Sequence, residues 1–247
     1  MTVIWHDIEC GGYGEDLPLW RSLAAEYGDP VLDVGAGTGR VALDLARAGY
    51  RVTALDRDPE LIAALEHRLA DNSRIPRDIC HTVVADARDF DLGGERFPLC
   101  IMPMQTIQLL GGAAGRAAFL VHALAHLRRG GVLAVAIAEA LELYEVTEGV
   151  PFPLPDIREL DGVVYSSQPV AVRADRGGFV LERRRETVAA AGERTVEQDL
   201  IRLDRLTAAG LEREGRAAGF IVADRESVPE TSDYVGSEVV ILRAPDE

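Results

Sequence analysis

The segment 31–40 constrains the fold of this chain more than any other. Its first four residues, Val-Leu-Asp-Val, form a short apolar strand, which is followed by glycines at alternate positions: Gly35, Gly37 and Gly39. An apolar pattern with helical spacing then begins at Val41. In a strand, glycine turn and helix of this kind, a ligand can lie against bare backbone N–H groups at the start of the helix. The segment therefore predicts a ligand-binding turn.

A carboxylate stands directly after the second predicted strand. That strand covers residues 51–55, and Asp56 follows it. Asp56 lies roughly 20 residues beyond the glycine turn. At this spacing, an acidic residue can accept both ribose hydroxyls of a nucleoside. The two features together predict a nucleoside cofactor and leave open which one.

Strands and helices alternate through the first 140 residues. Strands are expected at 31–34, 51–55, 82–85, 99–102 and 132–138. Helices are expected at 16–26, 39–48, 58–70 and 115–127. This order is typical of a doubly wound, mostly parallel sheet. With two last strands at 220–225 and 237–243, the predicted fold class is an α/β, Rossmann-like sheet of seven strands.

The pattern changes after Glu139. Long strands are expected at 162–173, 178–190 and 194–205. Alternation of apolar and polar residues in the second of them indicates an antiparallel meander with one solvated face, inserted after the fifth strand. The basic run 183–185 is assigned to that solvated face. The proline-rich segment 151–155 is expected to be a stiff connection, and a helix at 207–218 leads to the last strands.

Composition argues against several classes of site. A net charge of −15 argues against binding of nucleic acid, and the absence of lysine excludes a P-loop lysine or a pyridoxal Schiff base. No run approaches the roughly 20 apolar residues of a membrane span, and no signal peptide is evident. Cys10, Cys80 and Cys100 are widely spaced, as in reduced thiols of a cytoplasmic protein. His122 and His126 have no acidic or cysteine partner nearby in the sequence, so no metal site is expected.

The charges near the turn distinguish between nucleoside cofactors. Arg40 occupies the third glycine position of a nicotinamide-binding turn, and Asp33 would oppose a pyrophosphate. S-adenosylmethionine carries no phosphate and bears a sulfonium and an ammonium, which acidic residues suit. Asp86 follows the third strand, where its carboxylate can accept the exocyclic amine of adenine, with the backbone N–H of Ala87 available to the ring. S-adenosylmethionine is therefore favoured over a nicotinamide cofactor.

At these residues the chain resembles the class I S-adenosylmethionine-dependent methyltransferases. The segment 31–39 matches the first motif of that family, 54–58 its second acidic loop and 84–87 its third motif. Two positions depart from the family pattern, because Arg129 stands where proline is usual and Pro98 where aspartate is usual. The resemblance covers about residues 30–140 and implies the cofactor far more specifically than the methyl acceptor.

The resemblance implies a set of cofactor-binding residues at the strand ends and in the N-terminal segment. They are Tyr13, Asp33, Gly35, Ala36, Gly37, Asp56, Arg57, Asp86, Ala87, Met102 and Pro103. The glycines would lie against the homocysteine part, Asp56 would hold the ribose and Arg57 would flank the adenine. The backbone of Met102 or Pro103 would lie near the methionine amine. Whether Asp33 contacts the cofactor or only braces the turn stays open.

Residues that would serve the acceptor are less determined. Methyl transfer chiefly requires alignment of the reacting atoms, and a base is needed only if the acceptor is protonated. His6 is a candidate base, and Gln105 or Gln108 could orient an acceptor. The alternatives, a surface histidine and polar residues at a helix start, stay open.

The resemblance also implies a division of labour along the chain. Residues 1–30 would be a lid segment, 31–140 the cofactor-binding core, 141–206 a β-meander cap over the acceptor, and 207–247 the completion of the core sheet. The expected activity is N- or O-methylation of a small molecule, with S-adenosylhomocysteine as product. A cofactor binder without methyl transfer and, less favoured, a nicotinamide-dependent oxidoreductase stay open as alternatives. The acceptor, the methylated atom and a monomeric or homodimeric state are not determined.

Overall fold

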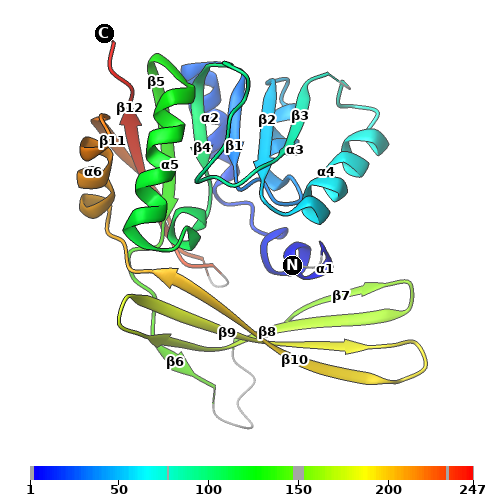
Figure 1. Ribbon diagram of the computed structural model, residues 1–247. Helices are drawn as coiled ribbons and strands as arrows, with labels where there is room; N and C mark the ends of the chain where they lie inside the picture. Colours follow the sequence, from blue (N-terminus) through cyan, green and yellow to red (C-terminus); the bar gives the residue numbers. More distant parts are fainter. Residues whose placement is uncertain (1–2, 77, 147–152, 232–233, 247) are drawn as a thin grey trace.

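The protein consists of a seven-stranded sheet flanked by helices and a second, five-stranded sheet beneath it (Figure 1). The structure is a computed structural model, and it describes residues 3–76, 78–146, 153–231 and 234–246. The segment 151–155 was predicted to be a stiff connection, and its first two residues lie outside the described residues.

The first sheet has the strand order β11-β12-β5-β4-β1-β2-β3. The five neighbouring strands β5, β4, β1, β2 and β3 are parallel. Strand β12 pairs antiparallel with both β5 and β11. The strands are β1 (Val31–Val34), β2 (Val52–Asp56), β3 (Cys80–Val84), β4 (Phe97–Met102), β5 (Leu127–Ile137), β11 (Ile221–Val228) and β12 (Ser237–Arg243). The predicted Rossmann-like fold class is confirmed.

Helices cover both faces of this sheet, which explains why its central strands are buried. Every residue of β1 is buried, as expected for a strand packed on both sides. On one face lie α2 (Leu17–Tyr27), α3 (Arg40–Arg47) and α4 (Pro59–Asp71). On the other lie η1 (Thr106–Leu109), α5 (Gly112–His126) and α6 (Ala208–Ala217). The predicted start of α4 is confirmed, because the Asp58 side chain accepts a hydrogen bond from the Glu60 N–H.

The second sheet is the predicted antiparallel meander with two further short strands. Its order is β10-β9-β8-β6, and β7 also pairs with β8. The strands are β6 (Tyr144–Glu145), β7 (Asp156–Leu160), β8 (Val163–Ala174), β9 (Gly178–Val188) and β10 (Arg194–Asp204). The three long strands agree with the sequence prediction to within two residues at their ends, whereas β6 and β7 were not predicted.

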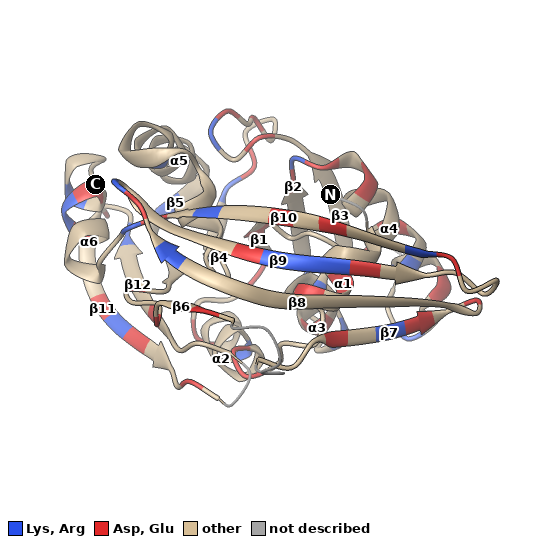
Figure 2. Ribbon diagram, turned by 90° about the horizontal axis from the view of Figure 1, so that it is seen from below, with Lys and Arg blue, Asp and Glu red and all other residues tan. Residues whose placement is uncertain are grey.

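A short N-terminal helix, α1 (Val3–Cys10), was also not predicted. It lies between the first sheet and the second, where it contacts α4, β7 and β8 (Figure 1). Its position corrects part of the assignment of the basic run on β9 to solvent, because Arg185 is buried against α1, whereas Arg184 is exposed as predicted. Figure 2 shows this basic run on β9 between two acidic stretches.

Both histidines of α5 make structural contacts, and the His122 ring donates from Nδ1 to the Phe90 carbonyl at 3.1 Å. His126 Nε2 accepts a hydrogen bond from the Leu92 N–H at 3.1 Å, and its ring packs on Phe90. In the described part of the chain, no group of histidine, cysteine and acidic side chains is arranged to hold a metal ion. None of the described helices has the length and apolar character that a membrane crossing requires.

Candidate cofactor site

The three loops singled out in the sequence meet at one edge of the first sheet. The backbone N–H groups of Gly35 and Ala36 donate to the carbonyl of Leu55, and the Ala85 N–H donates to the carbonyl of Asp56. Since β1, β2 and β3 are adjacent and parallel, the loops after them share the carboxyl edge of the sheet. This is the edge at which ligands bind in open α/β sheets.

Asp56 connects the first two loops. Its Oδ2 accepts a hydrogen bond from the Gly37 N–H at 2.8 Å, and its Oδ1 accepts one from the Asp58 N–H at 2.9 Å. The side chain is half-buried, and each carboxylate oxygen has a further lone pair for another donor. Asp56 therefore fixes the glycine turn and keeps acceptor capacity for ribose hydroxyls, the role that the sequence predicts.

Asp86 lies in the third loop and is held by its own neighbour. Arg88 donates to both of its carboxylate oxygens, at 2.9 and 2.6 Å, and the Arg88 backbone N–H adds a third bond at 2.8 Å. These hydrogen bonds and the Arg88 charge lower the pKa of Asp86 to about 2, and Arg57 contributes in the same direction. The adjacent Ala87 is buried. Asp86 is thus a permanently ionised acceptor at the rim of the site.

Asp33 is the most unusual group of the site. Its side chain is 1% exposed, and neither carboxylate oxygen makes a hydrogen bond of good geometry to a described residue; the backbone N–H of Ala42, near the start of α3, contributes only a weak interaction. Burial raises the pKa of Asp33 to about 7, against the opposing charge of Arg40. A buried acceptor without a donor is costly to keep, by about 1–3 kcal/mol. Such a group calls for a donor from outside the chain.

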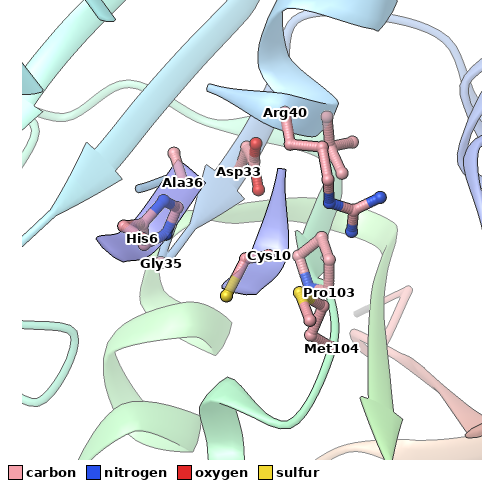
Figure 3. Close-up of a pocket in the computed structure, with 9 residues that line it drawn as sticks. His6, Cys10, Asp33, Gly35, Ala36, Arg40, Pro103 and Met104 are labelled. Carbon is pink, nitrogen blue, oxygen red and sulfur yellow. The ribbon is translucent and has the colours of Figure 1, made fainter. Parts of the chain in front are cut away.

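A small cavity of about 30 Å³ lies beside Asp33 (Figure 3). It borders the glycine turn, the start of α3, the end of β4 and α1. The residues that line it are His6, Cys10, Asp33, Gly35, Ala36, Arg40, Val41, Pro103 and Met104. The cavity therefore brings together five of the predicted site residues, His6, Asp33, Gly35, Ala36 and Pro103. Met102 is fully buried at the end of β4, and Asp56, Asp86 and Ala87 do not line the cavity.

Arg40 organises the segment that precedes β1. Its guanidinium donates to both carboxylate oxygens of Asp16, at 2.5 and 2.8 Å, and to the Tyr13 carbonyl at 2.9 Å. It also lies over the Tyr13 ring, 5.0 Å from the centroid. Sequence reasoning considered Arg40 only as a residue in place of glycine. Its partners are 24 and 27 residues away, and no local pattern points to them.

The glycine turn is covered by two side chains. Gly35 and Gly37 have φ angles of 77° and 56°, the left-handed region that favours glycine. A Cβ at Gly35 would lie 2.5 Å from Thr106 Cγ2, and one at Gly37 would lie 2.3 Å from His6 Nε2. Glycine is therefore required here for both backbone conformation and close approach, which is how a cradle for a ligand is built.

His6 has a defined hydrogen-bonding state. The Thr38 hydroxyl donates to Asp7 Oδ1 at 2.8 Å, so its contact of 3.3 Å with His6 Nδ1 requires the ring N–H as donor. Burial lowers the pKa of His6, which makes the ring neutral near pH 7. Nε2 is then the ring nitrogen with a free lone pair, and the ring borders the cavity.

The two glutamines differ in position. Gln108 is buried, and its amide donates to the carbonyls of Ala138 and Asp204, at 3.1 and 2.8 Å, and accepts from the Ala138 N–H at 2.8 Å. It thus ties η1 to the end of β5 and to β10. Gln105 is half-buried immediately before η1. Their predicted role toward an acceptor stays a prediction.

Comparison with known proteins finds a family match over part of the chain. Residues 31–131 match the model of a family described as a methyltransferase domain. The probable cobalt-precorrin-6B C(15)-methyltransferase (decarboxylating) of Methanothermobacter thermautotrophicus is 36% identical over 92 residues, which is 35% of this chain. The chain spans 40% of the length of that curated relative.

Solved structures are similar over nearly the whole chain. A sugar N-methyltransferase from a Streptoalloteichus species has a TM-score of 0.74 at 19% identity, covering 98% of this chain and 92% of its own. A methyltransferase of Streptomyces caelestis has a TM-score of 0.71 at 21% identity, covering 95% and 92%. An amino pentose methyltransferase of Micromonospora echinaspora, solved with S-adenosylmethionine bound, has a TM-score of 0.69 at 21% identity, covering 98% and 97%. At these identities the likeness establishes the shared fold, including the second sheet.

Proposed function

We propose that this chain is a class I S-adenosylmethionine-dependent methyltransferase that transfers a methyl group to an amine of a small, sugar-like molecule, a proposal supported by the methyltransferase-domain match over residues 31–131. The observation that carries the proposal is Asp33, a buried carboxylate without a donor, beside the glycine turn. A cationic ammonium such as that of S-adenosylmethionine is the kind of group that satisfies such a carboxylate. The sugar-like acceptor is supported by the proteins that share both sheets, two of which are named for sugars or an amino pentose.

The residues at the carboxyl edge fit this cofactor. Asp33 would pair with its ammonium, Asp56 would accept the ribose hydroxyls, and Asp86 would accept the adenine amine. Bound S-adenosylmethionine supplies a methyl group on a sulfonium, which is an activated leaving group. The chain then has to align the acceptor with that methyl group and exclude water.

The same carboxylates disfavour the alternative cofactor. A nicotinamide dinucleotide would place its pyrophosphate at the glycine turn, next to the Asp33 carboxylate. A pyrophosphate next to an ionised carboxylate is repelled by it. The guanidinium of Arg40 is already bonded to Asp16, so it is not available to offset this repulsion. The turn thus suits a cation better than an anion.

His6 suits an amine acceptor. An alkyl ammonium has no lone pair and must lose a proton before it can attack a methyl group. The neutral ring of His6, with Nε2 unprotonated, has the state of a proton acceptor. Of the three acceptor candidates, it is the one at the cavity.

The test uses S-adenosylmethionine labelled in its methyl group and a panel of amino sugars, each with its hydroxyl analogue. Mass spectrometry of the products should show label on the amino compounds and none on the matched hydroxyl analogues. Transfer only to hydroxyl groups would refute the amine acceptor. Cofactor binding by calorimetry without transfer to any acceptor would favour the non-catalytic alternative.

A further inference from the structure

Helix α1 is bonded on one side to the first sheet and its loops. Asp7 accepts hydrogen bonds from the Thr38 hydroxyl, in the glycine turn, and from Arg68 of α4. Arg68 also donates to the Thr38 carbonyl at 3.0 Å. His6, the preceding residue, lies against Gly37. One turn of α1 thus covers the glycine turn and is fixed to it by a carboxylate.

On its other side, α1 is bonded to the second sheet. Glu9 is 7% exposed and accepts two hydrogen bonds from Arg185, at 2.7 and 2.9 Å. The Ser167 hydroxyl donates a third, at 2.7 Å. Trp5 packs edge-on against Tyr165, and the Arg185 guanidinium carbon lies 5.4 Å from the centroid of the Trp5 ring.

The pair of Glu9 and Arg185 holds α1 in place more strongly than a surface ion pair would. Both side chains are less than a tenth exposed, at 3% and 9%. Separating this pair leaves the buried Glu9 carboxylate without the guanidinium, whereas Arg185 keeps a second acidic partner in Asp199, at 3.0 Å; exposing a buried charge in this way is costly. By contrast, Arg158 of β7 reaches Asp7 from a half-exposed position at 3.4 Å. The buried pair therefore dominates the connection between α1 and the second sheet.

With α1 in this position, the cradle is closed. The cavity of about 30 Å³ has room for about one or two water molecules, and His6 and Cys10 of α1 form part of its wall. The amino-acid end of S-adenosylmethionine is much larger than that. Because His6 lies against Gly37, a ligand that packs on the Gly37 backbone would have to displace α1.

We propose that α1 is a latch, fastened to the second sheet by Glu9, Arg185 and Ser167, whose release limits cofactor exchange. The latch rests on the proposed function, because it assumes that the adenosyl cofactor binds at the glycine turn. The second sheet would cover the methyl acceptor. Through the latch, this sheet would also control access of the cofactor to the glycine turn. Loosening the pair between Glu9 and Arg185 should therefore speed cofactor exchange.

The experiment measures association of S-adenosylhomocysteine with the full chain by stopped-flow tryptophan fluorescence, with Trp5 on α1 as the reporter. The observed rate should rise with ligand concentration to a plateau, which is the opening rate of α1. Glu9→Gln, which removes the charge and keeps the shape, should raise the plateau about tenfold. Arg158→Gln, at the exposed pair, should raise it about twofold and provides a second test if the Glu9 variant does not fold.

The matched control is Glu186→Gln. Glu186 is the next residue after Arg185 on β9, faces the other side of the sheet, and pairs with Arg194 at 2.6 Å. This variant should leave the plateau unchanged. An observed rate that stays linear in ligand concentration, or a plateau that neither Glu9→Gln nor Arg158→Gln moves, overturns the latch while the proposed function stands. Failure of the ligand to bind at all, measured by calorimetry, overturns both.

Discussion

Replacement of Asp33 by asparagine should make the free protein more stable, and increasingly so as the pH rises. Folding raises the pKa of Asp33 from 3.8 to about 7. Because the folded state favours the protonated carboxyl, the unfolded state binds fewer protons between these values, and stability is lost as the pH rises from about 4 to about 7. Asparagine, which is neutral at every pH, does not carry this penalty.

The size of the effect follows from the two pKa values. Each pKa unit corresponds to about 1.4 kcal/mol, so the penalty in the unmodified protein is about 2 kcal/mol at pH ~5.5 and about 4 kcal/mol at pH ~8.5. The stability gained by Asp33→Asn should therefore grow by about 2 kcal/mol between these conditions. Urea denaturation of the cofactor-free proteins at both pH values measures it.

Binding should change in the opposite direction. A cationic ammonium favours the ionised form of Asp33, so affinity for S-adenosylmethionine should rise as the pH passes about 7. Asp33→Asn should weaken binding about tenfold or more and remove most of this pH dependence, as measured by calorimetry. Equal stability gains at both pH values, or undiminished affinity, would refute the reasoning about Asp33.

Two further substitutions distinguish residues that bind the cofactor from residues that only stabilise the fold. Asp56→Ala should weaken S-adenosylmethionine binding at least about tenfold in calorimetry, because it removes the ribose acceptor and the partner of the Gly37 N–H; unchanged affinity would exclude Asp56 from the site. Gln108→Leu should lower the free energy of unfolding by about 3 kcal/mol in urea denaturation, since three buried hydrogen bonds are lost. Its cofactor affinity should stay the same, and a selective loss of transfer to the acceptor would instead support the role predicted from the sequence.

The parts of the fold that depend on local pattern were predictable. The strand 31–34 has the predicted bounds, and α4 begins at the predicted cap and proline. The site loops were predictable for the same reason, because the residues that follow parallel strands share one edge of the sheet. Glycines and acidic residues at strand ends therefore indicate a candidate site without knowledge of long-range contacts.

The parts that depend on distant partners were not predictable. Helix α1 has eight residues, no acidic residue in its first turn and no basic residue in its last, so its sequence alone gives little reason for a helix. Its stability comes from tertiary contacts, such as that of Glu9 with Arg185, which is 176 residues away. The same distance explains why Arg185, in the basic run on β9, was misassigned to solvent, while its neighbour Arg184 is exposed as predicted. A run of arginines indicates a solvated surface only where no buried acid faces it.

The arginines near the site explain why one carboxylate is left without a donor. Arg88 is bonded to Asp86. Arg40 is the cation that most lowers the pKa of Asp33, but it gives its hydrogen bonds to Asp16 and the Tyr13 carbonyl. If Asp16 were absent, the guanidinium of Arg40 could turn to Asp33 and neutralise it. Asp16 therefore keeps Asp33 available to an external cation while Arg40 fixes the segment before β1. Stability is lost at Asp33, and a bound ammonium that pairs with this carboxylate would recover that loss.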